Sequence, residues 1–326
     1  MDEAAAERHS IEIAEEEAGR RLDAVLAARL PALSRSRIQA LIAEGRLASG
    51  GAAVTTASRK VKPGEAFDLT VPPAEAPRLE GQAIPLTIVH EDSAVIVVDK
   101  PAGMVVHPAA GNPDGTLVNA LIAHCGPSLT GIGGEARPGI VHRLDKGTSG
   151  LIVAAKTAAA HESLTRQFAE RSISRLYEAL VWSRPRPPEG EIAGNIGRSP
   201  RNRKKMAVLK RGGREALTRY RTLASYAEGL VSRVECRLMT GRTHQIRVHL
   251  TEFGNPLLCD PLYGRKAPAA LARLPEAARE AIAGLERQAL HAKTLGFLHP
   301  ESGERVEFSS GLPPELSRVI DNLESI

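Results

Sequence analysis

The sequence predicts an α+β protein of two domains. Its 326 residues exceed the usual size of a single domain, which is roughly 150 residues. A proline-rich stretch at residues 72–77 is typical of a stiff, extended linker. On both sides of it, segments of helical periodicity alternate with short apolar, β-branched runs. We therefore expect an acidic disordered tail over residues 1–17, a small αβ domain with the linker over residues 18–77, and a larger α+β domain over residues 84–326.

The composition is that of an ordinary globular protein. Hydrophobic residues make up 42% and charged residues 25% of the chain, so a packed core can form. No apolar run approaches the roughly 18 residues of a membrane span, and the acidic N-terminus lacks the order of a signal peptide. We therefore expect a cytoplasmic protein with no membrane partner. Cys125, Cys236 and Cys259 are widely spaced, which favours reduced thiols over a disulfide framework.

Charge is distributed unevenly along the chain. Residues 1–17 hold seven acidic residues and one arginine, a net −6, so the remainder carries +11 within a total of +5. A basic body of this kind favours a polyanionic partner. Aromatic residues make up 3% of the chain, which argues against extended base-stacking platforms. Contacts from arginine and lysine to phosphate would have to dominate.

The small domain is expected to begin with two helices. Apolar residues recur at helical spacing over residues 21–30, and Pro31 ends that helix. A second helix is expected over residues 35–44, with Ser34 as its N-cap and Gly45 at its C-terminus. Two short strands follow, over residues 52–54 and 67–71.

The larger domain is expected to mix strands and helices. Apolar and β-branched runs predict strands, over residues 95–98, 151–155, 173–182 and 231–238. Helical periodicity predicts two helices, over residues 116–124 and about residues 157–171. Within the third strand, residues 175–181 are expected to alternate between buried and exposed.

A polar loop between apolar elements carries a cluster of ionisable residues. A turn at residues 137–139 leads into a segment where Asp145 lies close to His142, Arg143 and Lys146. Loops held on rigid elements often present reactive side chains. Cationic neighbours favour the ionised form of a carboxylate, which a nucleophile or general base requires. An ion-paired structural aspartate is the alternative, and the residue types alone favour it.

The complete segment favours the catalytic interpretation. His142-Arg143-Leu144-Asp145, followed by Lys-Gly-Thr-Ser-Gly at residues 146–150, closely resembles the catalytic motif of the pseudouridine synthases that modify large-subunit ribosomal RNA. The resemblance implies that Asp145 is the catalytic nucleophile or base. It also implies that Arg143 fills the space left by a flipped nucleotide, with His142 beside it at the RNA.

Four further residues are implicated by the same resemblance. Residues 99–108 match the family's first motif, so Lys100 and His107 either contact RNA or support the site. Tyr177 corresponds to a tyrosine that stacks on the target base and has been suggested as a proton acceptor, and a phenol suits both roles. Leu290 corresponds to a leucine that packs near the base. Taken alone, Tyr177 and Leu290 would be packing residues.

Residues 240–250 give another match to the family. The arginine at the position of Arg247 pairs with the catalytic aspartate, which implies that Arg247 holds Asp145. The same segment contains His244 and His249, without a cysteine or carboxylate at ligand spacing. We therefore expect no metal site.

Basic residues are concentrated in two regions. Between residues 198 and 214 the chain has eight basic residues and no acidic one: Arg198, Arg201, Arg203, Lys204, Lys205, Lys210, Arg211 and Arg214. We expect Arg203, Lys204 and Lys205 to contact RNA phosphates, and a solvated loop is the alternative. In the small domain, helix–helix–turn–strand with leading arginines resembles the S4 RNA-binding domain. That resemblance implies RNA contacts from Arg35 and Arg37, although a small basic unit could instead bind a protein.

Within the family, the chain most resembles the S4-bearing D type. The resemblance implies a catalytic domain with a mixed, largely antiparallel central sheet. It implies a cofactor-free monomer that isomerises specific uridines to pseudouridine in 23S ribosomal RNA, as naked RNA or in the assembling large subunit. The sequence lacks a nucleophile elbow, a dinucleotide-binding glycine motif and a Walker lysine motif. The alternatives are a non-catalytic RNA-binding or ribosome-assembly protein of the same fold, and an aspartate-dependent nucleotide hydrolase.

Overall fold

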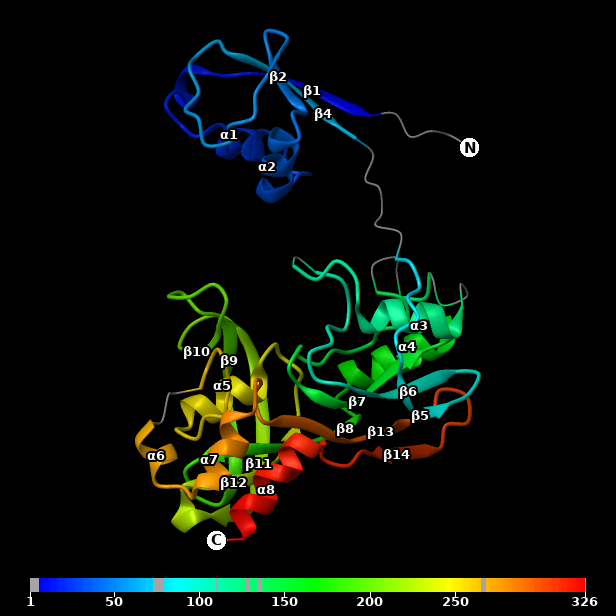
Figure 1. The fold of residues 1–326 in the computed structure, drawn as a ribbon. Coiled ribbons are helices and arrows are strands. Elements are labelled where there is room, and N and C mark those ends of the chain that lie inside the picture. The colour runs from blue at the N-terminus through cyan, green and yellow to red at the C-terminus, as the bar shows by residue number, and fades with distance from the viewer. Residues whose placement is uncertain are drawn as a thin grey trace. The chain divides into compact units, whose positions relative to one another are not determined.

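The chain divides into two compact units at residue 78 (Figure 1). The computed structural model describes residues 6–72, 79–109, 111–126, 129, 131–133, 137–264 and 268–325. Residues 1–5 of the expected tail and 73–77 of the expected linker lie outside the described residues. Each unit has its own hydrophobic core, so each is described by itself.

The first unit consists of a four-stranded antiparallel sheet and two α-helices. Its elements are β1 (Glu7–Glu12), η1 (Glu15–Glu17), α1 (Leu22–Arg29), α2 (Arg35–Ala43), β2 (Leu47–Ser49), β3 (Ala52–Ala53) and β4 (Ala66–Val71). The strands pair in the order β1-β4-β2-β3. As predicted, the Ser34 hydroxyl caps α2 by accepting a hydrogen bond from the backbone N–H of Arg37. Gly45 follows α2 in the left-handed conformation, with φ of 72°.

The expectation of a disordered acidic tail is wrong for residues 6–17. Strand β1 pairs with β4 along its whole length, and Ile13 is buried in the core of the unit. Glu17 is also buried, and its hydrogen bond with Arg29, at 2.9 Å, lowers the pKa of Glu17 to about 2. The acidic composition hid a strand pattern, in which Ile11 and Ile13 alternate with polar residues.

The second unit is built on a ten-stranded mixed sheet. Its strands are β5 (Thr87–Glu91), β6 (Val95–Lys100), β7 (Ser149–Ala155), β8 (Ser174–Trp182), β9 (Glu189–Arg198), β10 (Met206–Leu209), β11 (Arg214–Tyr226), β12 (Val231–Leu238), β13 (Leu290–Leu298) and β14 (Arg305–Ser309). They pair in the order β10-β9-β11-β12-β8-β13-β7-β6-β5, with β14 added beside β13. Among these strand pairs, β13 and β7 run parallel and the others antiparallel. The predicted mixed, largely antiparallel sheet is confirmed.

Helices pack on the two halves of this sheet. They are α3 (Leu117–Cys125), α4 (Ala158–Ala169), α5 (Gln245–Glu252), α6 (Pro268–Ala272), α7 (Glu276–Ala283) and α8 (Pro314–Glu324), with a short η3 (Ala227–Gly229). Helix α4 packs on β7, α5 packs across β9, β10 and β11, and α7 packs on α8 (Figure 1). Over the described residues, no helix has both the length and the apolar character to cross a membrane.

All the strands and helices predicted for this unit are present, as β6, β7, β8, β12, α3 and α4.

Strand β8 is buried on both faces, whereas its residues 175–181 were expected to alternate between buried and exposed. Tyr177, Ala179 and Val181 of β8 belong to one core cluster, whereas Leu180 and Trp182 belong to another. Both faces of β8 are therefore covered, one by each cluster, and its two edges are paired with β12 and β13. This burial gives Tyr177 a fixed surrounding.

Candidate active site

Three adjacent strands and one helix supply the site. Asp145 lies in the loop before β7, Tyr177 lies in β8, and Leu290 begins β13. Strands β8, β13 and β7 are neighbours in the sheet, and α5 carries Arg247. These four residues line one hollow of about 580 Å³, which we call the Tyr177 pocket. The structure thus brings together residues that are far apart in the sequence.

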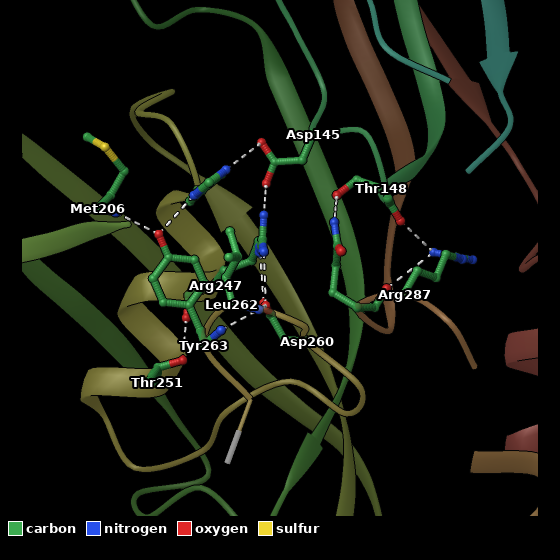
Figure 2. Close-up of polar contacts among 12 residues, drawn as sticks. Asp145, Thr148, Met206, Arg247, Thr251, Asp260, Leu262, Tyr263 and Arg287 are labelled. Carbon is green, nitrogen blue, oxygen red and sulfur yellow. Dashed lines mark hydrogen bonds and ion pairs between the residues drawn. The ribbon is translucent and has the colours of Figure 1, made fainter. Parts of the chain in front are cut away.

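Arg247 links two carboxylates. Its Nη1 donates a hydrogen bond to Oδ2 of Asp145 at 2.9 Å, and its Nε and Nη2 donate to Asp260 at 2.7 and 2.9 Å (Figure 2). Burial disfavours the charged guanidinium, but its bonds to Asp260 and Asp145 outweigh burial and raise the pKa of Arg247. The guanidinium is therefore charged and oriented where it meets Asp145. The pairing of Arg247 with Asp145 that the resemblance implied is present.

Asp260 is a member of the site that the sequence analysis missed. Its side chain is fully buried, and Oδ1 also accepts the backbone N–H groups of Leu262 and Tyr263. These backbone bonds of the turn fix the orientation of the carboxylate that binds Arg247. The sequence offers one weak signal, since an aspartate before a proline indicates a turn, but it does not indicate which cation that aspartate meets.

His244 faces the other oxygen of Asp145. Its Nε2 lies 3.9 Å from Asp145 Oδ1, and its Nδ1 lies 2.8 Å from the hydroxyl oxygen of Tyr263. That hydroxyl also accepts the backbone N–H of Met206 at 2.7 Å (Figure 2). Burial lowers the pKa of His244, so the imidazole is neutral at neutral pH. His244 also has φ of 57°, and a non-glycine residue held in this left-handed conformation is common at functional sites.

Tyr177 contributes a protonated phenol to its pocket. The residue is 6% exposed, and burial raises the pKa of its hydroxyl. At neutral pH the hydroxyl therefore keeps its proton, so it can accept another proton only by passing its own on. The flat ring remains available for stacking on a base.

Two of the expected RNA-contact residues line the pocket in different ways. Arg143 is exposed and borders the Tyr177 pocket. His142 instead packs on the ring of Phe168 at 4.7 Å, and its Nε2 accepts the backbone N–H of Val153. Burial lowers the pKa of His142 to about 3. His142 is therefore neutral and does not supply the positive charge near Asp145 that the sequence suggested.

Lys100 and His107, which were expected either to contact RNA or to support the site, occupy different surroundings. Lys100 is fully buried at the end of β6, and its Nζ donates hydrogen bonds to the carbonyl oxygens of Pro101 and Met104 at 2.8 and 3.0 Å. Burial, with the charge of Arg287, lowers the pKa of Lys100 to about 7. The position of Lys100 fits the supporting role that was left open for it, because its side chain stabilises the following turn and does not reach the surface. His107 lines the pocket, and its buried Nδ1 has no hydrogen-bond partner among the described residues.

The basic residues expected to bind phosphate lie outside the pocket. Arg203 and Lys204 are exposed in the turn between β9 and β10. Lys205 is half-buried, with its Nζ 5.8 Å from the centre of the Tyr263 ring. In the first unit, the guanidinium of Arg35 donates hydrogen bonds to the buried carboxylate of Asp23. RNA contacts from these side chains, and from the half-buried Arg37, stay predictions.

A second hollow of about 710 Å³ adjoins the first. We call it the Arg287 pocket. The two hollows share six lining residues: His107, Arg143, Leu144, Asp145, His244 and Arg247. Arg287 donates to the carbonyl oxygen of Gly147 at 3.1 Å, and Gln288 donates to the Thr148 hydroxyl (Figure 2). Arg287 also donates to Glu315 of α8 at 2.6 Å. The segment before β13 therefore holds the loop that carries Asp145, which no local pattern could have predicted.

The side chains around Asp145 suit nucleophilic or acid–base chemistry. A carboxylate, a fixed guanidinium and a neutral imidazole border both hollows, and a protonated phenol borders the Tyr177 pocket. Throughout the described ranges, no three or more histidine, cysteine, aspartate or glutamate side chains are grouped so as to hold a metal ion.

Comparison with known proteins identifies the class. The profile of RNA pseudouridylate synthase matches residues 94–252, and that of the S4 domain matches residues 20–67. The chain is 48% identical over 315 residues to ribosomal large subunit pseudouridine synthase D of Zymomonas mobilis, covering 96% of each chain. It is 47% identical to the protein of that name from Neisseria meningitidis serogroup B, covering 94% of this chain and 79% of that one.

A solved structure agrees with this classification. Human RNA pseudouridylate synthase domain containing 4 superposes with a TM-score of 0.54 at 25% identity, covering 73% of this chain and 92% of that chain. The fold and the sequence comparisons thus define a pseudouridine synthase with an S4 domain. The chain belongs to the RNA pseudouridine synthase family, and it is an RNA pseudouridine synthase enzyme.

Proposed function

We propose that this enzyme isomerises specific uridines to pseudouridine in the 23S RNA of the large ribosomal subunit. The names of the relatives from Zymomonas mobilis and Neisseria meningitidis support this substrate. The net positive charge of the chain beyond residue 17 suits an RNA partner, as does the S4 domain. We further propose that it acts in the cytoplasm as a monomer, on naked RNA or on the assembling subunit.

Asp145 is the proposed nucleophile or base. The reaction breaks the bond between C1′ of the ribose and N1 of uracil and forms a bond between C1′ and C5, while the C5 proton is lost and N1 gains a proton. The observation that carries this assignment is the 2.9 Å bond from Arg247 to Asp145, at the junction of two hollows. A charged guanidinium that is itself held by Asp260 fixes the orientation of the attacking carboxylate.

The Tyr177 pocket is the proposed receptor for the target base. A hollow of about 580 Å³ falls in the range of small-ligand pockets, and an RNA base must leave its stack to enter such a pocket. Tyr177 offers its ring for stacking, and the buried Leu290 packs beside it. Arg143 is exposed and borders the same hollow, which suits a side chain that replaces the flipped base.

Two alternative functions make different predictions. A non-catalytic assembly protein of this fold would have no need of a carboxylate held by an oriented guanidinium at the pocket. A nucleotide hydrolase that depends on aspartate would use a metal or a second carboxylate on its substrate, whereas Asp260 is fully buried and bonded to Arg247. The isomerase therefore accounts best for the arrangement.

The test is to map pseudouridines in ribosomal RNA from cells with and without the protein, and to repeat the reaction on 23S transcript with purified enzyme. Asp145→Asn should abolish conversion and leave RNA affinity near that of wild type, because an amide is isosteric but neither a nucleophile nor a base. Residual conversion above about one thousandth of wild type would contradict the assignment. Unchanged 23S RNA in the deletion strain would contradict the substrate.

Tyr177 is tested by two substitutions. Tyr177→Phe should bind RNA as wild type does, since stacking needs only the ring, and normal turnover would remove the hydroxyl from the proton path. Tyr177→Leu should weaken both binding and turnover, because stacking between a base and an aromatic ring contributes about 1–3 kcal/mol. Unchanged kinetics in the leucine variant would make Tyr177 a packing residue.

A further inference from the structure

The function proposed above assigns no ligand to the Arg287 pocket. Its volume of about 710 Å³ exceeds that of the Tyr177 pocket, yet it is lined by neither Tyr177 nor Leu290. Asp145 and Arg247 border both hollows. A target base in the Tyr177 pocket would therefore leave the Arg287 pocket open to another part of the same RNA.

We propose that the Arg287 pocket binds an unpaired nucleotide adjacent to the target uridine, and that Glu286 selects a base with an exocyclic amino group there. The proposal rests on the function proposed above, since it requires a target uridine beside Asp145. Adjacent nucleotides of one strand can occupy the two hollows because these share the wall made by Asp145 and Arg247. Proteins that read RNA sequence commonly splay unpaired bases into separate pockets in this way.

The lining of the Arg287 pocket matches the parts of a nucleotide. Val105, Leu262 and Leu285 supply apolar surface for the faces of a base. Arg143 and Lys146 are exposed cations on the same lining, where they can meet a phosphate. A pocket of this volume accommodates a nucleotide. Neither a purely apolar ligand nor a free anion would use both kinds of surface.

Besides Asp145, which is bonded to Arg247, two acidic residues line this pocket, and they differ in their partners. Glu315 accepts hydrogen bonds from the guanidinium of Arg287 at 2.6 and 3.2 Å, so its charge is compensated. Glu286 is exposed on the lining, and its carboxylate has no hydrogen bond or ion pair with the described part of the chain. Glu286 is therefore the carboxylate that is available to a ligand.

A carboxylate distinguishes bases by the donors on their edges. Cytosine, adenine and guanine each present an amino group that can donate to Glu286, and glutamate is a known acceptor for the cytosine amino group. Uracil presents two carbonyl oxygens around a single N–H, and these oxygens repel a carboxylate. The pocket should therefore prefer an amino-bearing base over uracil as the neighbour of the target.

Occupancy of this pocket is coupled to the catalytic loop by bonds from its own wall. Arg287 binds the carbonyl oxygen of Gly147, and Gln288 binds Thr148, on the loop that carries Asp145. A side chain at Gly147 would meet Gln288 Oε1 at 2.5 Å, so the two segments fit closely. The neighbouring base should therefore influence the rate of conversion as well as RNA affinity.

The test crosses enzyme variants with RNA variants. The RNA is a fragment that contains a uridine converted by wild type, with the nucleotide on its 5′ or 3′ side changed to uridine in turn. For wild type, kcat/KM should fall about tenfold when an amino-bearing base is replaced at one of the two positions. Glu286→Gln should abolish this difference, because an amide can pair with uracil as well as with amino-bearing bases. Glu280→Gln, on an exposed part of α7 outside both hollows, is the matched control and should keep the difference.

The outcomes separate this proposal from the function on which it rests. Wild-type conversion with no preference at either neighbouring position would overturn the proposal and leave the function standing. A preference that survives in Glu286→Gln would show that another residue reads the base, and would overturn the role of Glu286. Failure of wild type to convert any large-subunit uridine would instead contradict the proposed function.

Discussion

Tyr263 and His244 are joined by a contact of 2.8 Å between the tyrosine hydroxyl oxygen and Nδ1 of the imidazole. Because the hydroxyl oxygen already accepts the backbone N–H of Met206, its own hydrogen is available to Nδ1. The neutral imidazole then carries its hydrogen on Nε2, which faces Oδ1 of Asp145 at 3.9 Å. Asp145 thus has Arg247 at one oxygen and an oriented imidazole near the other.

Tyr263→Phe should lower kcat by about tenfold and leave RNA affinity near that of wild type, because loss of an outer hydrogen bond typically costs 10–100-fold. The phenyl ring keeps the packing against Arg247, so the change removes only the two bonds of the hydroxyl, to the Met206 N–H and to His244, and it acts on the site through the tautomer of His244. Single-turnover kinetics with a binding assay measure the two quantities separately. Tyr220→Phe is the matched control, since that buried hydroxyl bonds the Pro187 carbonyl oxygen instead. An equal loss in both variants would mean that Tyr263 has a general structural role.

The sequence could predict the pair of Asp145 and Arg247 because each lies in a contiguous motif that can be recognised locally. It could not predict Asp260, Tyr263 or Arg287, because their importance comes from partners brought close by the sheet. Arg287, for example, meets Gly147 across a separation of 140 residues. Over the described residues, local periodicity predicted α1 to α4 and the strands β3, β4, β6, β7, β8 and β12, whereas β9 to β11, β13 and α5 to α8 were not predicted.

The errors have equally specific causes. A direct RNA contact was one of the two roles expected for Lys100, but residues at a strand end can point either way, and this side chain points inward. The N-terminal acidic segment was judged by its charge, although its pairing with β4 depends on a strand some 60 residues later. Both errors concern burial, which a single local pattern does not determine.

His249 should make the second unit less stable in acid. Burial lowers its pKa to about 4, and the side chain is fully buried against Thr218. An unfolded chain binds a proton at this histidine below about pH 6.5, whereas the folded chain does not until about pH 4. Above pH 6.5 this histidine therefore does not reduce the free energy of unfolding. As the pH falls from 6.5 towards 4, it reduces that free energy by up to about 1.4 kcal/mol per pH unit.

Unfolding of the second unit can be followed by the fluorescence of Trp182, the chain's single tryptophan. His249→Gln should reduce the dependence of stability on pH between 6.5 and 4, because the amide does not titrate. His124→Gln, at a partly exposed histidine paired with Glu91, should leave that dependence largely unchanged. Identical pH profiles for wild type and His249→Gln would contradict the assignment.

The turn between β9 and β10 should hold RNA through phosphate contacts. Replacement of Arg203, Lys204 and Lys205 by alanine should weaken binding and flatten its salt dependence. Each lost contact should reduce the slope of log affinity against log salt by roughly 0.7 to 0.9. Affinity measured across a salt series gives this slope. A variant with the same loss of charge elsewhere, at the exposed Arg273, Arg305 and Arg318, should keep the wild-type slope.

Deletion of residues 1–77 should leave an active enzyme with poorer substrate selection. The second unit has its own cores, and every residue assigned to chemistry lies in it, so the truncated protein should fold and still form pseudouridine. It should need more RNA and accept more uridines, because the S4 domain supplies positioning rather than base chemistry. Fluorescence of Trp182 checks the fold, and mapped pseudouridines measure site choice.

The defect should shrink as salt is lowered, since the lost contacts are those of exposed charges. A full-length variant with Arg37 and Lys60 changed to alanine separates charge from the rest of the domain, because Lys60 is exposed, Arg37 is half-buried, and neither belongs to the core of the unit. Arg35 is left in place in this variant, since it compensates the buried Asp23. The double variant should reproduce part of the affinity loss. A folded but inactive truncation would mean that the S4 domain completes the active site, and unchanged affinity and site choice would mean that it serves another partner.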